Sequence, residues 1–128
     1  ANMIDSILPL YLDAAREDQA LLLRKALRRC PTQLVANRMQ AFVGSKRRSN
    51  LRAAALLTEL PAAMALPAMT NLLQRPNHPQ VQMHLCEGLL AAGVSSSSLS
   101  PMVPAAVLQL AITRLNRRPT FRNIQPQR

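Results

Sequence analysis

Residues 65–93 read ALPAMTNLLQRPNHPQVQMHLCEGLLAAG, two apolar segments separated by a polar stretch that contains proline. Within each segment the apolar residues recur every three or four positions, as they do on one face of an α-helix. Pro76 and Pro79 prevent a helix from running through the middle, and Gly93 is a common residue type just after a helix. The stretch therefore predicts two helices joined by a turn, at residues 62–74 and 80–92, with a bend at Pro67.

Two similar helical hairpins are predicted in the preceding sequence. Asp18 and Thr32 are expected as N-caps, and Ser49 or Asn50 is expected to start a helix after a basic turn. The periodicity and the breakers place these four helices at residues 3–15, 18–29, 32–43 and 51–60. The three hairpins repeat at a spacing of about 30 residues, which is typical of solenoid proteins.

The sequence after Gly93 has a different character. Residues 94–100 are rich in serine and predict a linker of low complexity. Pro101 or Pro104 then opens a predicted helix at residues 101–116. Residues 117–128 are basic and have too little apolar content to fold alone, so an extended tail is expected.

The composition agrees with a helical fold. The chain has 128 residues, of which 48% are hydrophobic, and it contains one Tyr, two Phe and no Trp. Leucine, alanine, methionine and valine must therefore form the core, and this mixture favours helices over strands. The apolar segments are too short and too charged to cross a bilayer, and the first residues show no targeting peptide. We expect an all-α domain.

The hairpins resemble HEAT and armadillo-like repeats. Residues 65–93 have a helix with an internal proline, a short turn and a second helix introduced by Val81. The segment LRAAALL at 51–57 is similar to the second helix of such a repeat. Two departures are Gln82, where the family has a basic residue, and Asn77, near which the family often has Asp. The resemblance covers roughly residues 4–93 and implies an array at 3–93, a short α-solenoid of about three stacked hairpins.

No pattern predicts catalysis, metal binding or a cofactor. Cys30 and Cys86 are predicted to be buried, reduced thiols, which fits a reducing compartment. His84 lies two residues from Cys86, on a different side of a helix, so zinc ligation is not expected. The six carboxylates read as helix starts or solvated faces, and no phosphate-binding glycine loop is present. An enzyme is therefore not expected, nor is a small-molecule substrate.

The basic residues are the candidate functional groups. Lysine and arginine number 16 against 6 acidic residues, a formal net charge of +10, and no acidic residue follows Glu87. Such a balance favours a polyanionic or acidic partner. A cluster at Arg24, Lys25, Arg28 and Arg29 reads as a solvated helix face. The candidate contacts with RNA or another anion are Lys46, Arg47, Arg48, Arg52, Arg114, Arg117, Arg118 and Arg122.

Three functional hypotheses follow from these features. The first is a non-catalytic scaffold in a ribonucleoprotein such as an organellar ribosome, which docks protein through the helices and RNA backbone through the basic turn and tail. Its expected compartment is the mitochondrial matrix or another organelle, reached before a targeting peptide is removed. The second is a purely protein-binding peripheral subunit of a membrane-associated complex. The third, a nucleic-acid enzyme, lacks a catalytic constellation. Met64, Met69, Met83 and Met102 are expected to be core residues more often than contact surface.

Overall fold

The computed structural model describes residues 2–44 and 46–117, and this part of the chain folds into helices without a strand. The expected all-α class is therefore confirmed. The helices are α1 (Asn2–Asp13), α2 (Glu17–Arg28), α3 (Thr32–Phe42), α4 (Arg47–Glu59), α5 (Ala62–Gln74), α6 (Pro79–Ala91), α7 (Ser96–Leu99) and α8 (Ala105–Arg117).

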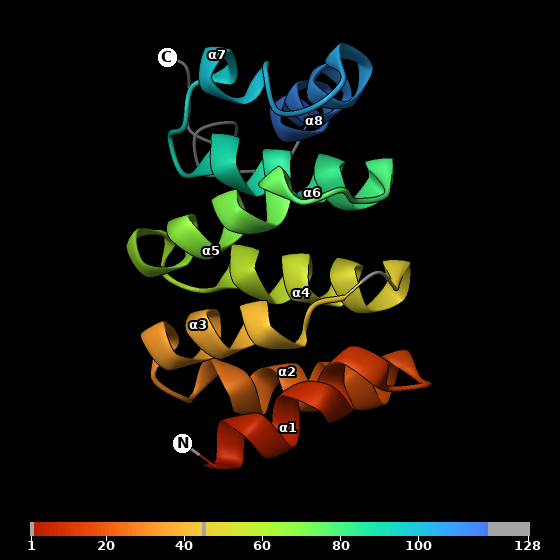
Figure 1. The fold of residues 1–128 in the computed structure, drawn as a ribbon, viewed down its shortest axis with the longest axis vertical. Helices are drawn as coiled ribbons and strands as arrows, with labels where there is room; N and C mark the ends of the chain where they lie inside the picture. The colour runs from red at the N-terminus through yellow and green to blue at the C-terminus, as the bar shows by residue number, and fades with distance from the viewer. Residues whose placement is uncertain (1, 45, 118–128) are drawn as a thin grey trace, which may run out of the picture.

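The helices follow one another along the long axis of the molecule, with α1 and α2 at one end and α7 and α8 at the other (Figure 1). Helices two positions apart in the chain pack on each other: α1 on α3, α3 on α5, α2 on α4, α4 on α6 and α6 on α8. Neighbours in the chain also pack, as α1 does on α2 and α5 on α6. A single apolar core runs through the stack.

The core consists mainly of leucine, alanine and methionine, as the composition requires. Leu8, Leu56, Leu57, Leu85 and Leu89 have almost no exposed surface. Met69 and Met83 are also buried, whereas Met64 is exposed and Met102 is half-buried against the core. The expectation that the methionines are core residues is therefore right for two of the four and wrong for Met64.

Gly88 marks a close approach between α4 and α6. A Cβ atom at this position would collide with Thr58 Cγ2 and would lie 3.4 Å from Met69 Sδ. The missing side chain therefore allows these two helices to pack at short range.

Several helix starts differ from the expected ones. Asp18 and Thr32 lie inside the first turns of α2 and α3, where Arg16 and Pro31 occupy the N-cap positions. α4 begins at Arg47, so Ser49 and Asn50 are buried residues of its first turn and not its start. Their side chains bond to groups distant in sequence. Ser49 donates to the carbonyl of Leu12 at 3.3 Å, and Asn50 donates to Asn77 Oδ1 at 2.9 Å.

The segment expected to be a serine-rich linker contains the short helix α7. Ser95 caps this helix by accepting a hydrogen bond from the amide of Ser98 at 3.3 Å. Leu99 at its end is buried in the core, which fixes the segment to the stack. Arg117, placed in the tail from the sequence, is the last residue of α8, and the predicted tail at 118–128 lies outside the described residues.

Candidate nucleic-acid interface

Each of the six carboxylate side chains is already paired with a cation. The pairs are Asp5 with Arg38, Asp13 with Lys46, Glu17 with Arg52, Asp18 with Arg16, Glu59 with both Arg24 and Arg28, and Glu87 with Arg114. The cations of residues 2–44 and 46–117 that have no carboxylate within ion-pair distance are Lys25, Arg29, Arg47, Arg48, Arg75 and Arg117. These residues carry the positive charge that the fold leaves for a partner.

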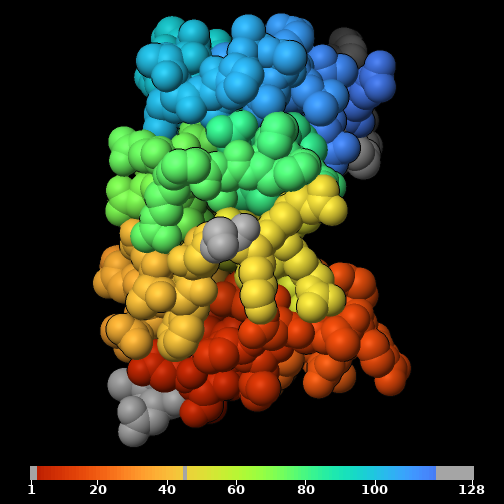
Figure 2. Space-filling model, turned by 45° about the vertical axis from the view of Figure 1, so that its right-hand side comes forward, coloured from red at the N-terminus to blue at the C-terminus, as the bar shows by residue number. Residues whose placement is uncertain are grey.

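Two of these uncompensated cations stand at the start of α4. Lys46 is the N-cap residue, Arg47 and Arg48 form the first turn, and all three side chains are exposed. Lys46 is held only loosely, with Nζ 3.9 Å from Asp13 Oδ1. Figure 2 shows the side chains at the start of α4, in yellow, projecting from the surface above the red and orange α1–α2 segment. The first amides of a helix add partial positive charge to such a position.

His78 joins this group from the turn before α6. Its Nε2 atom lies 3.2 Å from Arg47 Nη1, although 31 residues separate the two in sequence. Its Nδ1 atom accepts a hydrogen bond from the amide of Gln80 at 3.1 Å and so caps α6. We call Lys46, Arg47, Arg48 and His78 the basic edge.

The contact between Arg47 and His78 brings two donors together. A neutral imidazole whose Nδ1 accepts a bond carries its hydrogen on Nε2, and a guanidinium has only donors. Neither group can therefore satisfy the other at the Arg47–His78 contact. A phosphate oxygen beside them would accept from both, and charge-assisted bonds of this kind are the stronger ones.

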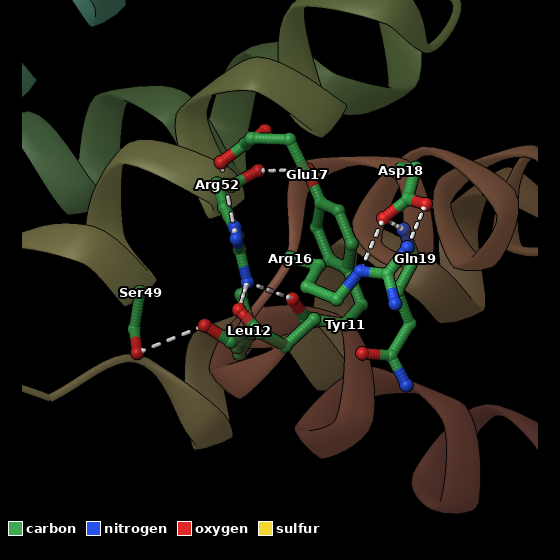
Figure 3. Close-up of polar contacts among 9 residues, drawn as sticks. Tyr11, Leu12, Arg16, Glu17, Asp18, Gln19, Ser49 and Arg52 are labelled. Carbon is green, nitrogen blue, oxygen red and sulfur yellow. Dashed lines mark hydrogen bonds and ion pairs between the residues drawn. The ribbon is translucent and has the colours of Figure 1, made fainter.

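Arg52 does not belong to this interface, contrary to the expectation from sequence. Its side chain is only 7% exposed. The guanidinium donates to the carbonyls of Tyr11 and Ala14 and forms an ion pair with Glu17 at 3.1 Å (Figure 3). Because all of these partners lie at the end of α1 and the start of α2, Arg52 fastens α4 to the first hairpin and cannot reach a phosphate.

Arg75 is an uncompensated cation that also serves the fold. Its guanidinium donates to the carbonyls of Val43 at 3.4 Å and Gln40 at 3.3 Å. These bonds satisfy carbonyl groups at the end of α3, so we do not assign Arg75 to the interface.

The expected residues of α8 form a separate group. Arg114 Nε lies 3.2 Å from Glu87 Oε1, and Arg114 and Arg117 line an open pocket of about 520 Å³ with His84 and Glu87. Because Arg47 meets the start of α6 at His78, Glu87 lies roughly 13 Å farther along that helix. The structure therefore does not bring the candidates at 46–48 and 114–117 together. Arg118 and Arg122 lie outside the described residues.

Residues 2–44 and 46–117 contain no group of three histidine, cysteine or acidic residues that could hold a metal ion. Cys30 and Cys86 are buried free thiols, as the sequence predicts. Burial raises the pKa of the Cys86 thiol to about 11. At neutral pH the thiol therefore stays protonated and is a poor nucleophile.

Sequence reasoning missed His78 as a member of the basic edge. The sequence shows only a histidine between Asn77 and Pro79 in a proline-rich turn. One local signal is the position of His78 directly before Pro79, because proline is common as the first residue of a helix. This position makes His78 an N-cap candidate. Its proximity to Arg47 depends on how α4 packs on α6 and has no counterpart in the local sequence.

No family model, curated protein or solved structure matches this chain. The function is therefore inferred from the charges, contacts and exposed surfaces of the chain itself.

Proposed function

We propose that this protein is a non-catalytic scaffold that binds the phosphate backbone of RNA through its basic edge and docks other proteins through its stacked helices. Its setting is a ribonucleoprotein, such as an organellar ribosome. The single observation that carries the proposal is the exposure of Arg47 and Arg48 without a carboxylate partner, beside His78. The tail residues Arg118 and Arg122 add further positive charge in the sequence.

We further infer that the stack is a short α-solenoid of HEAT-like hairpins closed by α8. In support of this, helices two positions apart pack on each other from α1 to α6, and α8 packs on α6. Repeat arrays of this kind present extended surfaces for other macromolecules. A scaffold role suits such a surface better than a catalytic role, which needs a convergent set of reactive groups.

The proposed contact with RNA is to phosphate and not to bases. Tyr11 is buried, and Phe42 is half-buried beneath the guanidinium of Arg38, which lies 5.7 Å from the ring centre. The aromatic rings of the described chain are therefore not available as base-stacking platforms. Binding should consequently depend on salt and hardly on base sequence.

A purely protein-binding role as a peripheral subunit of a membrane-associated complex is the second candidate. It is favoured by large apolar side chains that stay exposed at the α1–α2 end of the stack, among them Leu10 and Leu22. No helix within the described ranges is long and apolar enough to span a bilayer. On this account the uncompensated arginines contact acidic protein or lipid headgroups.

Sedimentation of the native protein separates the two candidates. Gently lysed source material is run on a density gradient with and without RNase, and the fractions are probed for this chain. The ribonucleoprotein proposal expects a fast-sedimenting species that collapses after RNase. A large species unaffected by RNase supports the protein-binding role, and a slow monomer under both conditions contradicts both.

A further inference from the structure

Exposed large apolar side chains are concentrated at one end of the stack. Among the described residues they are Met3, Leu10, Leu21, Leu22, Leu34, Met64 and Leu110, and the first five belong to α1, α2 and α3. The three most exposed are Leu22 at 67%, Met3 at 62% and Leu10 at 59%. All three lie on the hairpin of α1 and α2, which forms the end of the molecule (Figure 1).

The outer side of helix α1 is mixed, since its exposed residues are Met3, Ser6, Leu10 and Asp13. Ile4 and Leu8 face the core and are buried, whereas Met3 and Leu10 are exposed. Met3 and Leu10 are seven residues apart, so they lie on the same side of the helix. Two large apolar side chains on the outer side of a helix give a partner apolar surface to cover. Among the described residues α1 packs on α2, α3 and α4, and Met3 and Leu10 stay exposed.

The opposite end of the stack is closed differently. The exposed residues of α8 include Gln109, Asn116 and Arg117, and its one large exposed apolar residue is Leu110. A polar outer surface is what the terminal helix of a repeat array needs in water. The α1–α2 end also exposes charged residues, but it adds four large apolar side chains, Met3, Leu10, Leu21 and Leu22.

The exposed leucines of α2 stand beside positive charge. Lys25 is four residues after Leu21 and three after Leu22, and Arg29 is seven residues after Leu22, so these side chains share a side of the helix. Lys25 and Arg29 are both exposed and have no carboxylate within ion-pair distance in the described chain. Asp18, three residues before Leu21, shares this side, but its carboxylate is paired with Arg16 at 2.6 Å. Apolar side chains beside two unpaired cations favour a partner that is apolar and acidic.

We propose that Met3, Leu10, Leu21, Leu22, Lys25 and Arg29 form a docking surface, the α1–α2 end face, for an acidic amphipathic helix of a partner protein. The leucines and Met3 receive the apolar side of that helix, and Lys25 and Arg29 pair with its carboxylates. This inference rests on the protein-docking half of the proposed function. A second copy of this chain fits poorly, because two end faces would bring like charges together.

The test uses the full chain and two fluorescent helical peptides. One carries leucine on one side and glutamate on the other, and the second has lysine in place of every glutamate. Affinity is measured by anisotropy, and the bound surface is mapped by amide chemical shifts. The expected result is binding of the glutamate peptide alone, with the largest shifts in α1 and α2. L22A and the double variant K25E/R29E should each weaken binding about tenfold or more.

Matched controls keep this result apart from a general loss of charge or stability. L110A removes an exposed leucine at the other end, and R47E/R48E reverses two cations of the basic edge. Both should bind the glutamate peptide like the wild type. Conversely, K25E/R29E should leave binding to RNA through the basic edge largely intact, so that failure of the RNA proposal and failure of the end face are distinguishable.

Four results would overturn the end-face proposal. The first is that the glutamate peptide does not bind at millimolar concentration. The second is that the chemical-shift changes map to helices other than α1 and α2. The third is a concentration-dependent dimer that L22A abolishes, because the occupant would then be a second copy of this chain. The fourth is binding to anionic lipid vesicles that L22A abolishes while the peptide does not bind, which would make the surface a membrane contact.

Discussion

Tyr11 and Arg52 hold each other through reciprocal hydrogen bonds. The Tyr11 hydroxyl donates to the backbone carbonyl of Arg52 at 2.6 Å, and the Arg52 guanidinium donates to the backbone carbonyl of Tyr11 at 3.1 Å. Burial raises the pKa of Tyr11, so its hydroxyl remains a donor over a wide pH range. This lock joins α1 to α4 and removes Arg52 from the set of cations available to RNA.

The lock predicts a large loss of stability when Arg52 is replaced by methionine. R52M keeps much of the side-chain volume but removes the donor to the Ala14 carbonyl and leaves the Tyr11 carbonyl with only the long bond of 3.4 Å from the Ala14 amide. Leaving buried acceptors unsatisfied should lower the free energy of unfolding by about 2–3 kcal/mol. Y11F loses one bond and should cost about 1 kcal/mol.

Urea unfolding followed by circular dichroism measures these changes, and R48M is the matched control. Arg48 is exposed, so its replacement should alter the free energy of unfolding by less than about 0.5 kcal/mol. Equal effects of R52M and R48M would show that Arg52 is not a structural residue.

The close approach at Gly88 predicts that the effect of G88A on the free energy of unfolding differs between the wild type and a T58A background. In the wild type, G88A should destabilise the protein by about 1–2 kcal/mol, because the new methyl group collides with Thr58 Cγ2. In a T58A background the colliding atom is absent. There G88A should be neutral or stabilising by up to about 1 kcal/mol, since alanine is the better helix former.

A double-mutant cycle with thermal or urea unfolding measures this coupling. If G88A costs the same free energy in both backgrounds, Thr58 does not limit the approach of α4 to α6.

Burial of Cys86 predicts a loss of stability at alkaline pH. The pKa of this thiol is about 11 in the folded state, against about 8.5 for an unfolded cysteine. Between these values the unfolded chain loses the proton and the folded chain keeps it. The free energy of unfolding should therefore be fully retained below about pH 8.5 and fall by up to about 1.4 kcal/mol per pH unit above it.

The variant C86A tests whether the fall in the free energy of unfolding at alkaline pH comes from this thiol. It should be less stable than the wild type at neutral pH, because it removes a buried sulfur, but its stability should fall less steeply between pH 9 and 11. The raised pKa of Tyr11 contributes in the same direction at the upper end of this range. If the stability of C86A falls with pH as steeply as that of the wild type, the Cys86 thiol is not the cause of the alkaline loss of stability.

The sequence predicted the helices well where a breaker residue determines an end. The bounds of α5 agree with the expectation, because Pro61 precedes it and the Arg75–Pro76 step follows it. The start of α4 was placed too late, because Ser49 and Asn50 were expected to cap it. Their side chains instead form hydrogen bonds with Leu12 and Asn77, and no local sequence pattern predicts partners so distant in the chain.

The candidate site was harder to predict than the fold. Arg47 and Arg48 proved exposed and uncompensated, whereas Arg52, only a few residues later, is buried. The partners of Arg52 are mainly backbone carbonyls, which every residue possesses and no sequence pattern distinguishes. The contact of Arg47 with His78 likewise arises only when α4 packs on α6.

The salt dependence of RNA binding tests whether the basic edge contacts phosphate. Anisotropy of a fluorescent single-stranded RNA is measured from 50 to 300 mM KCl with the wild type, R47Q/R48Q and K25Q/R29Q. The two double variants remove the same net charge from different surfaces. If the basic edge binds the RNA backbone, R47Q/R48Q weakens binding and makes the negative slope of log K against log salt shallower by about 1.4, at roughly 0.7 for each lost phosphate contact. K25Q/R29Q should have little effect. Equal losses in both variants, or none in R47Q/R48Q, would contradict the claim that the basic edge binds the RNA backbone.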